Sequence, residues 1–266
     1  VALIAVVHAY VAQLAVGGGF FLWLTDAQAQ RTGDVKLLGW VRSHTKFFLL
    51  LTMVFGGVTG VGIWFVIGLV QPAGTSTLIH AFVFGWAIEW VFFLVEIIAL
   101  LIYHAYFDRM DGRLRLRVAL IYAAAAWLSL FIITGILSFM LTPGRWLQTG
   151  NFWDGFFNPT FWPSVVFRTC VAWMLAGLFA FVSAVREPDA ELRHQLQRIS
   201  SRWLLGPAAG IVVSALWYLQ TVPEPVRERL FVGNPETADW VWVFVLASLA
   251  LFGLGTLLAA RMPRLL

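Results

Sequence analysis

Residues 78–107 read LIHAFVFGWAIEWVFFLVEIIALLIYHAYF, a long apolar run that contains two carboxylates, Glu89 and Glu96. The run exceeds the roughly 20 residues that cross the hydrocarbon core of a bilayer as a helix. A spacing of seven residues is close to two helical turns, so both carboxylates lie on one helix face, about 10 Å apart along the axis. Each costs about 2.5–3.5 kcal/mol near the bilayer centre. We therefore expect them to face protein, water or a cofactor rather than lipid.

The composition of the whole chain indicates a membrane protein. Its 266 residues are 60% hydrophobic and 12% charged, and the mean hydropathy of +0.82 lies far outside the range of soluble domains. The net charge of +4 comes from residues between the apolar runs, so we expect no nucleic-acid binding. A single cysteine, Cys170, excludes an internal disulfide and a thiolate cluster within this chain. A metal would need histidine or carboxylate ligands, or would arrive in a macrocycle.

The pattern of apolar stretches predicts an all-α fold, a polytopic membrane bundle of about seven transmembrane helices. The predicted spans are residues 2–24, 47–70, 78–107, 116–141, 164–185, 203–219 and 240–260. We expect Gly206-Pro207 to shorten or kink the sixth span. Lys and Arg gather in the first, third and fifth connections, which places the N-terminus outside and the C-terminus in the cytoplasm. We divide the chain into a five-helix bundle, residues 1–185, and a part with two further helices, residues 186–266.

The first predicted helix carries His8 about two turns below the outer surface. The residues on its face are all small, namely Ala5, Ala12, Ala15 and Gly19. Such a face either lets a neighbouring helix approach closely or leaves room for a flat macrocycle beside the imidazole. Both alternatives stay open. His44, on the cytoplasmic side, is expected to be solvated.

Buried charged groups in two of the predicted spans suit several functions. At least one of Glu89 and Glu96 is expected to carry a proton at neutral pH. Such groups suit a proton pathway, a counter-charge for a buried cation, or a haem ligand. The simplest alternative is a neutral glutamate that is hydrogen-bonded to a nearby serine or threonine. Arg168, about one turn below the outer end of the fifth span, can snorkel to the surface or pair with a cofactor propionate.

Several short motifs follow one another within residues 1–185. They are His8, Ala87-Ile88-Glu89, Val95-Glu96, Phe107-Asp108-Arg109, Ser138-Phe139-Met140-Leu141-Thr142-Pro143-Gly144, Asn158-Pro159 and Trp162-Pro163. This ordered set resembles subunit I of the cytochrome bd-type quinol oxidases. The resemblance implies that His8 is a haem ligand near the outer surface, and that Glu89 and Glu96 serve a haem site and a proton path. The spacing of the two glutamates is one residue shorter than is usual in that family.

Parts of the family pattern are replaced or have no counterpart in these residues. Arg168 stands where the family has the histidine ligand of its low-spin b haem, and arginine does not ligate iron. The short connection at residues 222–239 replaces the long outer quinol-binding loop, and the later methionine and glutamate ligands have no counterpart. The resemblance therefore implies one haem, or two at most, the first at His8 with Glu89 across the iron.

Three functions remain open. The first is a haem-binding electron-transfer subunit of a respiratory complex in the bacterial cytoplasmic membrane. It would work with other membrane subunits, exchange electrons with a quinol, oxygen or a c-type cytochrome, and move protons along Glu89 and Glu96. The second is a cofactor-depleted scaffold that anchors redox partners. The third is a proton-linked transporter or channel, which the lack of an inverted repeat disfavours.

Overall fold

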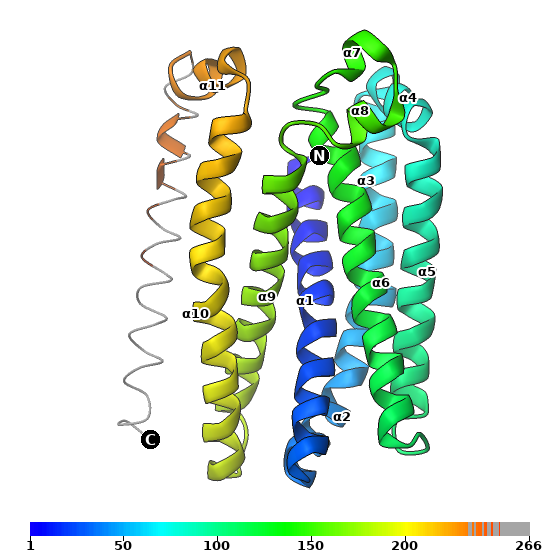
Figure 1. The fold of residues 1–266 in the computed structure, drawn as a ribbon, viewed down its shortest axis with the longest axis vertical. Coiled ribbons are helices and arrows are strands. Elements are labelled where there is room, and N and C mark those ends of the chain that lie inside the picture. The colour runs from blue at the N-terminus through cyan, green and yellow to red at the C-terminus, as the bar shows by residue number, and fades with distance from the viewer. Residues whose placement is uncertain (234–235, 237, 241, 244–245, 247–249, 251–266) are drawn as a thin grey trace.

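Long helices form the body of the protein, and short helices lie at one end of them (Figure 1). The structure is a computed structural model that describes residues 1–233, 236, 238–240, 242–243, 246 and 250. We call the end with the N-terminus, α4, α7, α8 and α11 the outer end, and the opposite end the inner end. The elements are α1 (Ala2–Thr32), α2 (Val35–Leu50), η1 (Leu51–Gly56), α3 (Gly57–Val70), α4 (Pro72–Ala81), α5 (Val83–Ala105), α6 (Gly112–Phe139), α7 (Trp146–Thr149), α8 (Phe152–Phe156), α9 (Phe161–Val185), α10 (Ala190–Thr221) and α11 (Glu224–Phe231).

Six segments of the described chain are long and apolar enough to cross a membrane. They are Ala2–Thr32, Val35–Val70, Val83–Ala105, Gly112–Phe139, Phe161–Val185 and Ala190–Thr221. The described residues contain no β-strand, so the prediction of an all-α polytopic bundle is confirmed for them. The predicted seventh span, residues 240–260, lies mostly outside the described residues. Which end faces the cytoplasm, and the division of the chain at residue 185, stay predictions.

The inner connections are much shorter than hydropathy predicts, because the helices continue beyond the apolar runs. α1 and α2 are separated only by a turn in which Gly33 has a φ of 67°. Asp34 then caps α2 by accepting a hydrogen bond of 2.9 Å from the amide of Leu37. Of the two effects predicted for Gly206-Pro207, shortening of the sixth span is wrong, because α10 has 32 residues and Pro207 lies within it. A kink at this position stays a prediction. A hydropathy pattern shows where charged residues begin, but a helix can continue beyond that point.

The third predicted span is divided near its outer end. α4 ends at Ala81, and Phe82, with φ −126° and ψ 29°, separates it from α5, which begins at Val83. The Phe82 ring is fully buried, with its centroid 4.7 Å from that of Phe139 and 5.5 Å from that of Phe152. The Phe82 ring is thus buried among aromatic rings at the outer end, at the point where α4 and α5 are separated. His80 therefore belongs to the short helix α4 and not to the spanning helix α5.

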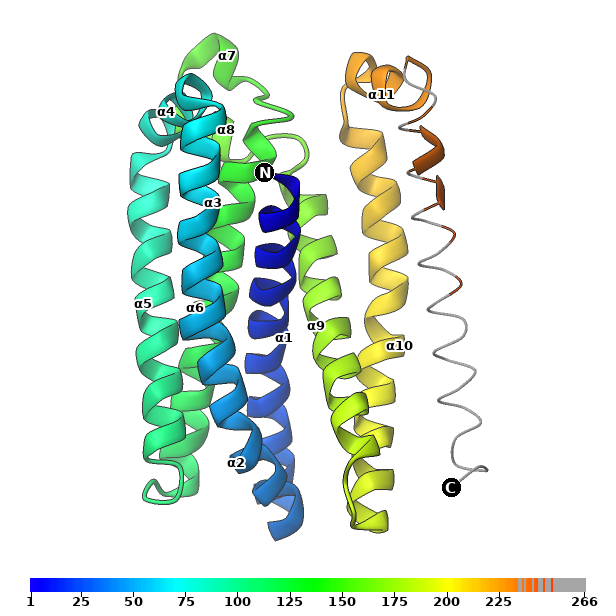
Figure 2. The same ribbon diagram turned by 180° about the vertical axis from the view of Figure 1, so that it is seen from behind.

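Three consecutive glycines, residues 17–19, bring α1 into close contact with three other helices. A Cβ on the first would overlap the backbone carbonyl of Ala172 in α9, and one on the second would overlap the ring of Phe48 in α2. On the third it would lie 3.1 Å from the Cα of Ala123 in α6. Small residues allow this approach between membrane helices. Both views show α1 between α9 and the helices α3 and α6 (Figure 2).

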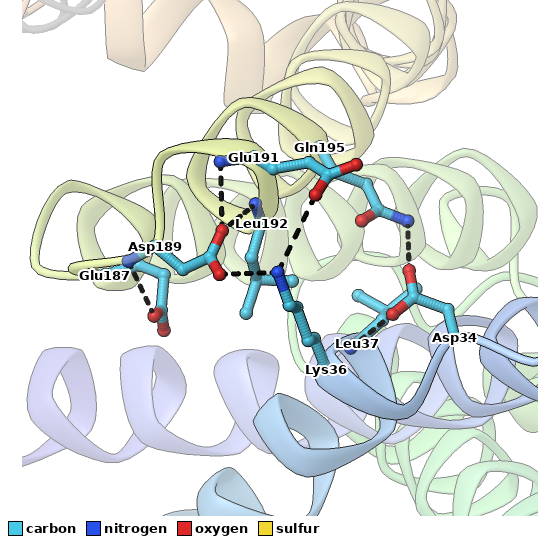
Figure 3. A network of polar contacts seen from close by, with 8 residues as sticks. All are labelled: Asp34, Lys36, Leu37, Glu187, Asp189, Glu191, Leu192 and Gln195. Carbon is cyan, nitrogen blue, oxygen red and sulfur yellow. Dashed lines mark hydrogen bonds and ion pairs between the residues drawn. The ribbon is translucent and has the colours of Figure 1, made fainter.

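A polar network joins the α1–α2 turn to the start of α10 at the inner end (Figure 3). Lys36 Nζ lies 2.7 Å from Asp189 Oδ2 and 3.6 Å from Glu191 Oε2. Gln195 Nε2 donates to Asp34 Oδ2 at 2.9 Å. Hydrogen bonds from Lys36 and from the first amides of α10 keep the pKa of the Asp189 carboxyl below its ordinary value. These contacts hold the second half of the chain against the first.

Asn158 organises the connection between α6 and α9 at the outer end. Its Oδ1 accepts from Thr142 Oγ1 at 3.0 Å and from the amide of Thr160 at 3.2 Å. Its Nδ2 donates to Ser138 Oγ at 2.8 Å and to the carbonyl of Gly155 at 3.0 Å. Two of the motifs that carry the family resemblance therefore meet in one buried hydrogen-bond network.

Candidate functional site

His8 is held on the outer half of α1 by a threonine of α3. Its Nδ1 lies 2.9 Å from Thr59 Oγ1, and the same hydroxyl lies 2.5 Å from the carbonyl oxygen of Phe55. A hydroxyl has one proton to donate, and the carbonyl can only accept, so the threonine oxygen accepts from Nδ1–H of the imidazole. That tautomer leaves Nε2 unprotonated, which is the form of histidine that binds metals. Nε2 has no hydrogen-bond partner among the described residues.

His8 is half-buried, and its ring lies close to the backbone of α3. A Cβ on Gly60 would lie 3.2 Å from the imidazole Cε1. The helices near it have few buried residues in their outer halves: those of α1 begin only at Ala15, and α3 has none. α5 has one buried residue, Gly85, before Glu96. The described residues of these three helices therefore cover the outer half of the bundle less than the inner half.

A ladder of polar side chains runs between the antiparallel helices α5 and α6. Each helix contributes three residues at intervals of seven. At the outer step Ser129 donates to Glu89, and at the inner step Tyr103 and Arg115 both donate to Asp26 of α1. The middle step consists of the buried residues Glu96 and Tyr122. We call this arrangement the α5–α6 ladder. On α5 the ladder continues the seven-residue spacing of Glu89 and Glu96 to a third residue, Tyr103, toward the inner end.

The two glutamates occupy different environments. Ser129 Oγ donates to Glu89 Oε1 at 2.7 Å, which is the contact that the simplest alternative anticipated. Glu89 is half-buried, whereas Glu96 is only 5% exposed. Within the described chain no hydrogen bond joins His8 to Glu89.

The inner step of the ladder is a buried ion pair that sequence analysis missed. Asp26 is fully buried, and its carboxylate accepts from Arg115 Nε at 3.0 Å and Nη2 at 3.1 Å. Tyr103 and Gln30 donate to the same carboxylate at 2.9 Å and 2.8 Å. The guanidinium also lies 4.6 Å from the centroid of the Phe107 ring. These contacts tie α1 to both helices of the ladder.

Three threonines at seven-residue intervals line one side of the second span, and we call them the threonine column. Thr59 contacts His8, and Thr45 Oγ1 lies 2.7 Å from His104 Nδ1 at the inner end. Thr52, between them, lies in the π-helical turn η1 and is buried. Its hydroxyl has no hydrogen-bond partner in the part of the chain that the structure describes. The spacing of seven was visible in the sequence and could have indicated this column.

Arg168 lies deeper in the bundle than predicted. α9 begins at Phe161, so seven residues, or about 10 Å, separate the arginine from the outer end of its helix. The guanidinium is half-buried, and the described residues give it neither a hydrogen bond nor an ion pair. The structure thus places a cation in the outer half of α9 with no acidic partner in the described chain.

The expectation that His44 is solvated is wrong. Its Nε2 lies 2.6 Å from Ser183 Oγ of α9, and its ring stacks on Trp40 with the centroids 4.0 Å apart. α2 begins well before the predicted start of the second span, so this histidine is packed between helices.

The side chains that could bind a metal limit which kind of metal site this part of the chain can form. The described residues contain no group of three or more His, Cys, Asp or Glu side chains that could hold a metal ion. A single imidazole is a weak site for a free ion, but it can serve as an axial ligand when a macrocycle supplies the other nitrogens. The tautomer of His8, whose Nε2 has no hydrogen-bond partner among the described residues, fits that role.

The fold and its site define an integral membrane helix bundle with buried ionisable groups. The chain matches the family described as cytochrome bd terminal oxidase subunit I over residues 1–221, and it belongs to that family. The match extends beyond the motifs described above and includes α10. No curated protein matches the sequence.

One solved structure is similar in fold, entitled "The structure of bd oxidase from Geobacillus thermodenitrificans". The TM-score is 0.75 at 21% sequence identity, and the alignment covers 86% of this chain and 55% of that chain. Our chain therefore spans about half the length of that relative.

Proposed function

We propose that this chain is a haem-binding electron-transfer subunit of a respiratory oxidase complex, located in the bacterial cytoplasmic membrane. The observation that carries the proposal is the geometry of His8. A threonine hydroxyl fixes the proton on Nδ1, and Nε2 has no hydrogen-bond partner among the described residues. Membership of the cytochrome bd terminal oxidase subunit I family supports the same reading. A bound haem would supply one-electron chemistry at its iron.

Three residues are assigned to the haem in this proposal. His8 is the axial ligand, and Thr59 orients its imidazole and fixes the tautomer. Glu89 is a second candidate ligand, because only its Oε1 receives the hydrogen bond from Ser129. Arg168 is the candidate partner of a propionate, because the described chain offers this half-buried cation no carboxylate.

Glu89 and Glu96 carry the proton path of the proposal. Both lie on one face of α5, and Glu96 is nearly inaccessible to solvent. A carboxyl group at such depth can take up a proton from one side and release it to the other. We assign the proton role chiefly to Glu96, which is further from His8 along the bundle.

The partners in this proposal are other membrane subunits, with quinol, oxygen or a c-type cytochrome as the redox partner. The outer halves of α1, α3 and α5 have few buried residues. A cofactor or another subunit at this surface would cover them. The family and the similar bd oxidase structure support quinol among these candidates.

The test is the visible spectrum of the purified complex after reduction with dithionite. We expect Soret and alpha bands, and His8→Ala should remove or shift them. His80→Ala is the matched control, because this exposed histidine bonds only within α4. A spectrum without these bands would reject the haem and leave the scaffold function. Glu96→Gln should slow proton uptake at unchanged haem content, and unaffected turnover would reject the proton role.

A further inference from the structure

We infer that a groove between the inner ends of α1 and α10 binds the phosphate group of an anionic phospholipid, with Arg198 and Arg202 as its main ligands. The groove lies at the opposite end of the bundle from His8, so lipid binding there depends neither on the proposed haem nor on the proton path. The contact is noncovalent and reversible.

The groove is polar and has a volume of about 380 Å³. Its walls come from α1, from the turn that follows it, and from the first turns of α10. Six polar side chains line it, namely Gln28, Asp34, Glu191, Gln195, Arg198 and Arg202. The volume lies within the range of small-molecule sites, about 300–1,000 Å³. Because the lining is mostly polar, the ligand must be a polar or charged group.

The two carboxylates of the groove already have partners within the protein. Asp34 accepts from the amide of Leu37 and from Gln195 Nε2, each at 2.9 Å. Glu191 Oε2 lies 3.6 Å from Lys36 Nζ (Figure 3). Both acidic residues lie at the innermost end of the groove, beside the α1–α2 turn and the start of α10. The arginines, which lie further along α10, are therefore not needed to balance these carboxylates.

Arg198 and Arg202 lie one turn apart on the same face of α10. Both are exposed, and neither has an ion pair within the described residues. Like charges at this spacing repel each other, and an anion bound between them removes the repulsion. Guanidinium groups match the geometry of phosphate oxygens, to which they can donate two hydrogen bonds each. Gln28 of α1 lines the same groove, and its side-chain amide can donate to the same anion.

The position of the arginine pair along α10 identifies the membrane as the source of the anion. Arg202 is the last charged residue before the apolar run of residues 203–219. Trp203 begins this run, and its ring centroid lies 5.1 Å from that of Phe21 in the core. Arginines at such a boundary lie at the level of the lipid headgroups. Basic pockets between membrane helices are typical sites for anionic headgroups. We therefore expect a lipid phosphodiester, such as that of phosphatidylglycerol, rather than free phosphate.

The experiment measures lipid binding by native mass spectrometry. The purified complex is stripped of lipid in a neutral detergent and titrated with phosphatidylglycerol or with the zwitterionic lipid phosphatidylcholine. We expect the wild-type complex to bind phosphatidylglycerol more tightly than phosphatidylcholine. Arg198→Gln and Arg202→Gln should each weaken phosphatidylglycerol binding about fivefold, the effect of one basic side chain beside an anionic lipid. Binding of phosphatidylcholine should stay unchanged in both variants.

The matched control is the double variant Arg113→Gln with Arg117→Gln. These two arginines are also exposed and one turn apart at the inner end, but they belong to α6 and do not line the groove. Unchanged affinity in both groove variants would overturn the inference. An equal loss in the control would overturn it too, because it would show a general effect of surface charge. Displacement of phosphatidylglycerol by an equal concentration of inorganic phosphate would overturn the assignment to a lipid.

Discussion

Replacing Asp26 by asparagine removes the counter-charge of Arg115 inside the bundle. The Asp26 side chain is fully buried, and that of Arg115 is 9% exposed. The substitution removes the negative charge of the side chain. It also replaces one carboxylate oxygen by an NH₂ group, which cannot accept the hydrogen bonds that this oxygen accepts. Breaking a buried pair by removing one partner costs about 3–5 kcal/mol, because the remaining charge stays buried. We therefore expect Asp26→Asn to lower the free energy of unfolding by about 3 kcal/mol or more.

Equilibrium unfolding of the detergent-solubilised protein, followed by circular dichroism, measures this change. The matched variant is the double substitution Asp26→Leu with Arg115→Leu, which leaves neither charge and should recover most of the loss. Lys36→Ala, which removes an exposed ion pair, should have a far smaller effect than Asp26→Asn. A loss below about 1 kcal/mol in Asp26→Asn, or a double variant no more stable than the single one, would refute the reasoning.

Three further outcomes follow from the packing and the capping contacts. Gly17→Ala should lower the unfolding temperature, because its Cβ would overlap the backbone of α9, whereas Gly39→Ala, which meets nothing within 4 Å, should not. Asn158→Ala should cost about 1–3 kcal/mol, since it removes the acceptor of the Thr160 amide and the donor to the Gly155 carbonyl, and faster proteolysis of the outer connection would show it. The pKa of Asp189 is lowered in the folded state, so its contribution to stability is full above the ordinary value of 3.8 and is lost as the pH falls through the lowered value. Lys36→Ala should weaken this dependence in acid unfolding curves.

The sequence was sufficient for the fold class because hydropathy and helix length are local properties. Six of the predicted spans are present, and both glutamates lie on α5, where Glu96 is buried and Glu89 is half-buried. The boundaries were less accurate. The polar stretch of residues 25–46 was predicted as a connection but forms the end of α1 and most of α2. Polar residues can extend a spanning helix past the apolar run, and hydropathy does not record that.

The contacts that define the site depend on residues far apart in the chain. Asp26 and Arg115 lay outside the predicted spans and resembled ordinary charged residues of a connection, yet they meet inside the bundle. The contact between His8 and Thr59 likewise joins two helices. In contrast, the threonine column and the α5–α6 ladder repeat every seven residues. A search for polar residues at that interval would have found both.

The haem content of the purified complex tests the central claim most directly. We predict that extractable haem is present in the wild-type complex, is lost or strongly reduced in His8→Ala, and is unchanged in His80→Ala. The physical reason is that His8 alone, among the residues assigned to this site, offers an unprotonated imidazole nitrogen to the iron. A wild-type complex without haem, or a His8→Ala complex with the full amount, would contradict the account.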